Sequence, residues 1–351
     1  MTIDLTGGVQ IRREYIFAQC PDAPGTRDAV NVWIENGNGA FGMRIGVEAL
    51  APKWDTHEIW LDIAFSDGRV ISGREHGPTH PAIGPEGLPT VRGAGPLRFR
   101  CVEPFRTWTV FFKGRAPEIT AMDLIKGTIP ADPVLRDVEF DIEMTMAAPP
   151  WVPGSLLADA GKTLSSGVEG EFMSPRYEQL FRAKGAMRVG GERFDVNARG
   201  LRIRRQGLRK FEGFWGHCWQ SALFPSGRAF GYNTYPPRPD GKPSYNEGYI
   251  FDGRGKLKPA RAVQVPWLTR LAPRGDDVSL VLETEDGPVA IQGETFVNTR
   301  SRGSAILPPD FPIVQQAHAC YHWDGEETFG MVERSSPPSK MFSSGVMAAD
   351  G

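Results

Sequence analysis

Residues Gly200 to Arg228 read GLRIRRQGLRKFEGFWGHCWQSALFPSGR. The last part of this stretch, from Trp219 to Arg228, has the spacing W-x4-F-x2-G-R, and the same spacing occurs from Trp60 to Arg69. A motif that recurs within one chain indicates a duplicated architecture. We therefore expect two similar halves, in which these tryptophans and turn residues are part of the architecture.

The signals on both sides of this stretch are those of an all-β protein. The chain of 351 residues contains 41 Gly and 30 Pro, a content that suits many short strands joined by tight turns. Asn36-Gly37 and Asp67-Gly68 supply the positive φ angles that hairpin turns require. The segment from Val138 to Met146 alternates apolar and polar residues, which predicts a strand with one buried face.

The length of the chain fits two domains of roughly 100–200 residues each. The run from Ala147 to Gly154 is rich in proline, which cannot donate to a β-ladder, so the first domain should end there. We expect an N-terminal β domain over residues 1–150, a connecting segment over 151–184 and a C-terminal β domain over 185–351. Short helices are expected within Leu156 to Lys162 and Tyr177 to Ala183.

Composition and charge limit the classes of partner. The formal net charge is −2 and the 40 Lys and Arg residues are dispersed, so we expect neither a nucleic acid nor an anionic membrane as partner. The four cysteines lie far apart, which is typical of reduced thiols, and no window approaches the ~18 apolar residues of a membrane span. We therefore expect a cytoplasmic protein, with a homodimer as the candidate assembly.

No cofactor is expected, because the chain lacks the P-loop, the dinucleotide-binding glycine motif, the H-E-x-x-H motif and the G-x-S-x-G motif. His318, Cys320 and His322 alternate along a predicted strand and offer ligand types that suit zinc. Same-face neighbours on a strand are about 6.6 Å apart, which favours a stripe of hydrogen-bonded side chains over a shared metal ion. No metal is therefore expected.

The arginine-rich strand from Arg202 to Arg205 is one candidate for a site. Its side chains alternate, so Arg202 and Arg204 share one face while Ile203 and Arg205 share the other. Arginine is almost never buried without a partner. Either the strand is solvated with surface ion pairs, or Arg202 or Arg209 reaches into a cavity and orients a substrate oxygen or a catalytic carboxylate.

Aromatic and titratable residues form two further candidates. Alternation places Trp215, His217 and Trp219 on one face, which suits either a hydrophobic ligand that needs a proton transfer or simple core packing. Next to Tyr177, Glu178 could act as a general acid or base if burial raises its pKa. Alternatively, Glu178 could anchor the domain junction by accepting hydrogen bonds from the arginines.

These motifs, in this order, resemble the tandem lipocalin-like family that includes the carotenoid 1,2-hydratases and related cyclases. The resemblance covers roughly residues 30–335 and rests on six segments: Trp60 to Arg69, Val138 to Trp151, Tyr177 to Gln179, Gly200 to Arg209, Gly216 to Phe230, and Phe329 to Glu333. It implies an all-β fold of two tandem lipocalin-like antiparallel β-barrels or sandwiches with few short helices.

The chain departs from the middle motif of that family, G-x-R-D-H-S-W-G-x-R. It keeps Gly200, Arg202, Gly207 and Arg209, but it has Ile203 to Gln206 where the family has Asp-His-Ser-Trp. If relatives transfer protons with that Asp and His, the chemistry of this chain must be different, relocated or absent.

The resemblance and the clustered residues lead to the hypothesis of a cofactor-independent lyase or isomerase. Its substrate would be an isoprenoid, a steroid or an aromatic metabolite, and its reaction hydration, dehydration, isomerisation or cyclisation. The alternative is a non-catalytic carrier of a lipophilic ligand. The candidate catalytic residues are Glu178, His217, Tyr177, Arg202 and Arg209. The candidate substrate-binding residues are Trp60, Trp215, Trp219 and His322.

Overall fold

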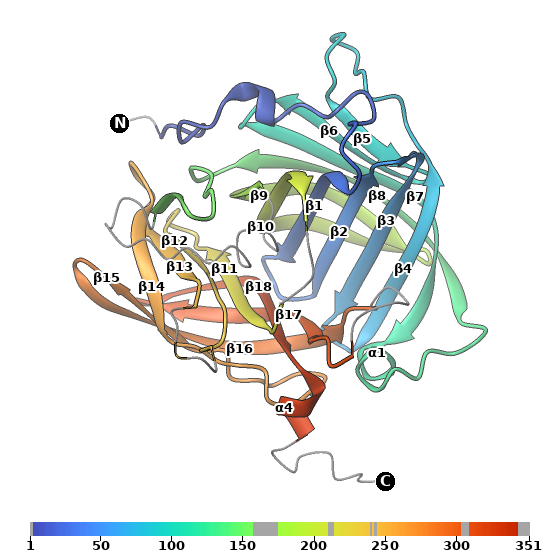
Figure 1. The fold of residues 1–351 in the computed structure, drawn as a ribbon. Helices are drawn as coiled ribbons and strands as arrows, with labels where there is room; N and C mark the ends of the chain where they lie inside the picture. The colour runs from blue at the N-terminus through green and yellow to red at the C-terminus, as the bar shows by residue number, and fades with distance from the viewer. Residues whose placement is uncertain are drawn as a thin grey trace.

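The computed structural model describes residues 3–156, 175–209, 214–238, 241, 244–302 and 309–342. Within these ranges the chain folds into two antiparallel β-sheets that contact each other (Figure 1). The predicted all-β class is confirmed, and the helices are few and short. No helix in the described ranges has the length and apolar character needed to cross a membrane.

Ten strands form the N-terminal sheet, in the order β4-β3-β2-β1-β10-β9-β8-β7-β6-β5. A short extra ladder pairs β4 with β7, and the sheet curls round on itself in Figure 1. Its strands are β1 (Thr26–Asn36), β2 (Phe41–Leu50), β3 (Lys53–Phe65), β4 (Arg69–Pro78), β5 (Val91–Ala94), β6 (Leu97–Glu103), β7 (Thr107–Thr120), β8 (Val134–Met146), β9 (Arg176–Val189) and β10 (Glu192–Leu208).

The second sheet is a closed barrel whose strands follow one another in chain order. They are β11 (His217–Leu223), β12 (Ala229–Thr234), β13 (Asn246–Phe251), β14 (Lys258–Gln264), β15 (Leu280–Thr284), β16 (Gly287–Arg300), β17 (Ile313–Trp323) and β18 (Glu326–Ser336). The last strand, β18, pairs with both β17 and β11, which closes the ring.

The helical elements are η1 (Ile11–Arg13), α1 (Ala121–Lys126) and α4 (Pro338–Phe342). The sequence analysis did not predict α1, although a capping box between Thr120 and Asp123 marks its start. Gly127 ends α1 in the left-handed region, with φ 71°. The buried face of this short helix packs beside Val297 of the barrel.

Strict alternation separates a core face from an opposite face on the strands. In β8, the residues predicted to be buried, from Val138 to Met146 in steps of two, are all buried, and the residues between them are exposed. The same alternation in β1 sends Val30 and Val32 into the core of the N-terminal sheet. It sends Asn31 and Trp33 to the other face, towards the barrel.

The boundary between the two sheets lies later in the chain than residue 185, the predicted start of the C-terminal domain. β9 and β10 complete the N-terminal sheet, because β10 pairs with β1 along its ladder and β9 pairs with β8. The barrel begins only at His217. The predicted helix from Tyr177 to Ala183 is wrong, since this segment lies in β9; of the other predicted helix, residues 157–162 lie outside the described residues.

The repeated motif occupies equivalent places in the two sheets. Trp60 lies in β3, shortly before the hairpin to β4, and Trp219 lies in β11, shortly before the hairpin to β12. Both tryptophans point out of their own sheet and towards the space between the sheets, where they line one cavity.

Candidate functional site

A cavity of about 800 Å³ lies between the outer face of the N-terminal sheet and the outer face of the barrel. Its walls come from β1, β2, β3, β4, β9 and β10 on one side, and from β11, β12, β16, β17 and β18 on the other. An apolar cluster beside it, which includes Leu201, Trp219 and Met331, holds the two sheets together. The described residues therefore place the cavity between the sheets.

Strand register explains why these residues meet at the cavity. Trp33 of β1 lies opposite Arg44 of β2, and Asn31 lies opposite Gly46, so that all four share the outer face. Gly46 in turn lies opposite Trp60 of β3. A Cβ atom at Gly46 would lie 2.1 Å from Cζ2 of Trp60, so only glycine lets this indole lie across β2.

Aromatic side chains form the apolar part of the wall. Trp33 and Trp219 meet edge to face, with ring centroids 6.5 Å apart, across the contact between the two sheets. The guanidinium of Arg44 lies over the rings of both Trp33 and Trp60, at 5.6 and 5.4 Å from their centroids. These contacts hold three tryptophans in place around the cavity.

His217 and Glu333 form a hydrogen-bonded pair of titratable groups in the cavity wall. Nε2 of His217 lies 3.2 Å from Oε1 of Glu333, and Nδ1 lies 2.6 Å from Oγ of Ser335, behind the ring. The other Glu333 oxygen accepts a hydrogen bond from Nε2 of Gln316 at 3.0 Å. Burial by itself would raise the pKa of Glu333, but the hydrogen bond and charge of His217, together with Arg44, lower this pKa to about 2.

Glu178 lies just behind the cavity wall. Its carboxylate forms an ion pair with Arg176 at 2.6 Å and accepts a hydrogen bond from Nε1 of Trp219 at 3.0 Å. Arg176 and Trp219 line the cavity, whereas Glu178 does not. Burial raises the pKa of Glu178, and the charge of Arg176 only partly opposes that effect. Because Glu178 belongs to β9 and Trp219 to β11, this hydrogen bond also joins the two sheets.

Basic residues outnumber acidic ones in the lining. The N-terminal sheet and the residue after it contribute Arg27, Arg44, Arg74, Arg176, Arg205 and Arg209. Three of these arginines form ion pairs with carboxylates that also line the cavity: Arg27 with Glu48, Arg44 with Glu333, and Arg74 with Glu58. The sequence analysis identified only Arg209 of this group as a candidate, because the dispersed positions converge only once the strands pair.

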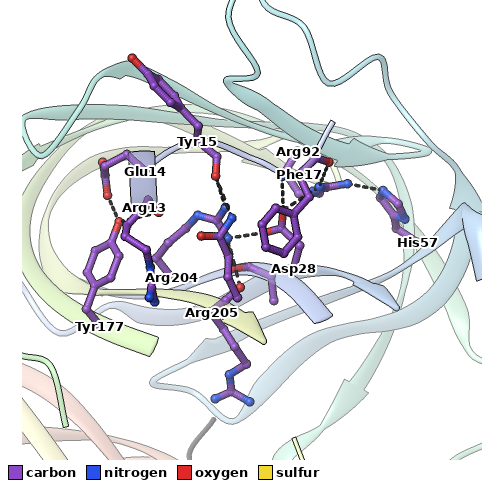
Figure 2. Close-up of polar contacts among 12 residues, drawn as sticks. Arg13, Glu14, Tyr15, Phe17, Asp28, His57, Arg92, Tyr177, Arg204 and Arg205 are labelled. Atoms are coloured by element: carbon purple, nitrogen blue, oxygen red, sulfur yellow. Dashed lines mark hydrogen bonds and ion pairs between the residues drawn. The ribbon is translucent and has the colours of Figure 1, made fainter. Parts of the chain in front are cut away.

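Tyr177 and Arg202 lie in a separate, buried polar network around Glu14. Figure 2 shows Tyr177 directed towards Glu14. The Glu14 carboxylate accepts hydrogen bonds from the Tyr177 hydroxyl, from Nη2 of Arg202 at 2.7 Å and from Nε1 of Trp108 at 2.7 Å. It also accepts the backbone N–H of Phe105 at 2.9 Å. These contacts fix the N-terminal segment against the sheet, on the face opposite to the cavity.

Arg204 belongs to a second buried network on that same face. It forms an ion pair with Asp28, which also accepts hydrogen bonds from Arg92 at 2.8 Å and from the backbone N–H of Phe17 at 2.6 Å. Figure 2 shows Arg204 among these partners and Arg205 directed away from them. The predicted alternation along the strand is therefore present. Arg202 and Arg204 share the face with the buried carboxylates, and Ile203 and Arg205 share the face that lines the cavity.

The remaining predicted site residues are scattered. Arg209 lines the cavity. Trp215 precedes β11 and does not share its alternation with His217: the indole packs against Tyr235 and donates to the carbonyl of Pro236 at 3.0 Å, outside the lining. His322 is exposed on the barrel. The atoms that His322, Cys320 and Glu327 could offer to a metal lie within 4.8 Å of one another.

His318 does not join that exposed group. It is buried, and its Nδ1 lies 2.8 Å from a carboxylate oxygen of Glu35 in β1. A Cβ atom at Gly42 would lie 2.2 Å from the same nitrogen, so glycine is needed there for the approach. The stripe from His318 to His322 is thus divided between the junction of the two sheets and the open surface.

The family model of the domain of unknown function DUF7064 matches residues 28–338, so the chain belongs to that family. The fold is similar to that of an AttH candidate from Nitrosomonas europaea, with a TM-score of 0.58 and 14% identity over 92% of this chain and 99% of that chain. It is also similar to that of CghA in complex with Sch210972, with a TM-score of 0.54 and 12% identity over 93% and 95% of the respective chains. No curated protein sequence matches the chain. The finer resemblance to the carotenoid 1,2-hydratases stays a prediction.

Proposed function

We propose that this member of the DUF7064 family is a cofactor-independent enzyme that moves protons on a small molecule with an apolar skeleton, bound between the two sheets. The observation that carries the proposal is the pair of His217 and Glu333, placed in an enclosed wall with three tryptophans. A concave pocket in which aromatic side chains stand beside convergent titratable groups is the default candidate for a small-molecule site. Hydration, dehydration, isomerisation and cyclisation are the reactions that such a site supports.

In this proposal His217 is the catalytic acid and base. Its Nε2 edge exchanges a proton with the bound molecule. Glu333 stays ionised at neutral pH because its pKa is about 2, so its negative charge stabilises the imidazolium that forms. Ser335 holds Nδ1 and thereby fixes the orientation of the ring.

Glu178 has a positioning role in this scheme. Its carboxylate reaches the cavity only through Arg176 and Trp219, which it holds by an ion pair and a hydrogen bond. Tyr177 and Arg202 lie on the opposite face of the sheet with Glu14 and take no part in the reaction. The catalytic step thus depends on residues from β11 and β18 of the barrel.

Exchange with heavy water tests the proposal without a known substrate. Purified protein is incubated in D2O with a small-molecule extract of its source organism, and compounds that gain deuterium are found by mass spectrometry. We expect at least one compound to gain deuterium with the wild type and with Arg188→Gln, an exposed control on β9, but not with His217→Ala. Equal labelling with and without His217, or none with the wild type, would sink the proposal.

The second candidate is a carrier of a lipophilic ligand. It is favoured by the middle motif, where Ile203 and Arg204 replace the Asp and His of the family that the chain resembles, and where the chain presents Ile203 and Arg205 to the cavity. A carrier would release an unchanged compound on denaturation and would label nothing in D2O. Native mass spectrometry of the purified protein, alongside the labelling experiment, separates the two functions.

A further inference from the structure

Among the arginines from Arg202 to Arg205, only Arg205 forms no ion pair in the described part of the chain. Arg205 is 6% exposed, and its guanidinium forms no hydrogen bond or ion pair with any described residue. Its Nε is buried and has no hydrogen-bond partner. The neighbouring carboxylates are already engaged, Glu48 by Arg27 and Glu178 by Arg176. Arg205 lines the cavity, and Figure 2 shows its side chain directed away from the network of Arg204.

Its surroundings are also positive. In the sheet Arg205 lies directly opposite Arg176 of β9. Burial lowers the pKa of Arg205, and the charges of Arg209 and Arg27 lower this pKa further. Like charges directly opposite each other destabilise a sheet. A buried charge without a partner is costly as well, since the folded chain gives up its hydration without a counter-charge. The charges of Glu48 and Glu178 offset this cost only in part, because each carboxylate already forms an ion pair with another arginine.

We propose that the molecule bound in this cavity carries an anionic group, a carboxylate or a phosphate, which binds at Arg205. A guanidinium presents a planar fork of donors that matches two oxygens of either group, and a bound anion would supply the missing negative charge. Arg176 stacks over the ring of Trp219, with its guanidinium 5.1 Å from the centroid, and so extends the positive surface towards that indole.

The ligand class is therefore amphipathic. The acidic end lies at Arg205, and the apolar skeleton lies against the indoles of Trp33, Trp60 and Trp219. His217 follows in the same wall, two residues before Trp219 on β11. This inference names the ligand of the site proposed above, and it holds for an enzyme and for a carrier alike.

Three compounds with the same naphthalene ring test it: 2-naphthoate, 2-naphthyl phosphate and the neutral 2-naphthamide, each titrated by calorimetry. We expect at least one of the two anions to bind the wild type about tenfold or more tightly than the amide, a difference of about 1.4 kcal/mol. Arg205→Gln should remove this preference and leave binding of the amide unchanged. Arg188→Gln, which removes an exposed charge from β9, should keep the preference.

Thermal unfolding checks the fold of the variant. Arg205→Gln should melt at the same temperature as the wild type or higher, because it removes a buried charge that faces like charges. The anion that binds should raise the melting temperature of the wild type and not that of Arg205→Gln. Equal affinity of the amide and both anions, no binding of either anion, or an anion preference that survives Arg205→Gln would each overturn the inference.

The outcome is separable from that of the proposed function. His217→Ala should bind the anions as the wild type does, since His217 is not part of the arginine group. If deuterium labelling fails while Arg205 still selects anions, the anion site stands and the enzymatic function falls. If labelling succeeds while the anions and the amide bind alike, only the anion site falls.

Discussion

Glu14→Gln should destabilise the protein strongly, although Glu14 lies outside the cavity. The Glu14 side chain is fully buried and accepts hydrogen bonds from Arg202, Trp108, Tyr177 and the backbone of Phe105. Glutamine has nearly the same shape but no charge, so the substitution leaves the guanidinium of Arg202 buried without a counter-ion. Breaking one partner of a buried ion pair costs about 3–5 kcal/mol, and we expect a loss in that range.

The assay is urea unfolding at pH 7, followed by tryptophan fluorescence, for Glu14→Gln, Arg202→Met and the double variant. The loss in the double variant should be smaller than the sum of the two single losses by about 1–3 kcal/mol, because the two groups are in contact. Glu103→Gln is the matched control: its exposed ion pair with Arg106 should contribute less than about 1 kcal/mol.

Two results would refute this reasoning. A loss below about 1 kcal/mol for Glu14→Gln would mean that the buried pair is not needed to hold the N-terminal segment. Loss of deuterium labelling in Arg202→Met, in a variant that is still folded, would mean that Arg202 takes part in the reaction as the sequence first suggested.

Two further predictions concern the cavity wall. The pKa of Glu333 is lowered to about 2 from 4.5, so its ionised form should contribute about 3 kcal/mol of stability that is present above pH 4.5 and lost as the pH falls towards 2. Glu333→Gln should therefore flatten the fall in unfolding free energy between pH 5 and pH 3. An unchanged slope would contradict the role given to Glu333. Gly46→Ala should displace Trp60, cost about 1–3 kcal/mol of stability by overpacking, and weaken the binding of the naphthalene compounds. Gly191→Ala, in a turn with open space around it, should bind these compounds as the wild type does.

Local patterns allowed much of the fold to be predicted. The alternation from Val138 to Met146 identified β8, and the repeated W-x4-F-x2-G-R motif located two equivalent hairpins. Alternation also divided Arg202 and Arg204 from Arg205 correctly, since a strand has a period of two whatever it pairs with. These successes rest on interactions between residues close in sequence.

The failures come from pairing between distant segments. The segment from Tyr177 to Ala183 has apolar residues at helical spacing, but pairing with β8 and β10 on both sides holds it as a strand with both faces covered. For the same reason the sequence placed residues 185–208 in the wrong half, since the β1–β10 ladder pairs the first strand of the N-terminal sheet with its last strand in chain order. Pairing between distant segments also assembles the candidate site. Glu333 and Arg205 were missed as site residues because only the fold brings them close to His217 and Trp219.

The strands that line the cavity keep their two faces apart, and this separation has an evolutionary consequence. On β1, Val30 and Val32 fill the core of the N-terminal sheet while Asn31 and Trp33 line the cavity. A mutation at Asn31 therefore leaves that core intact, whereas a mutation at Trp33 also removes an apolar contact between the two sheets. Relatives with this architecture can exchange the polar residues of the cavity face while the inner core is inherited intact, so a lineage can acquire new substrates faster than its fold diverges.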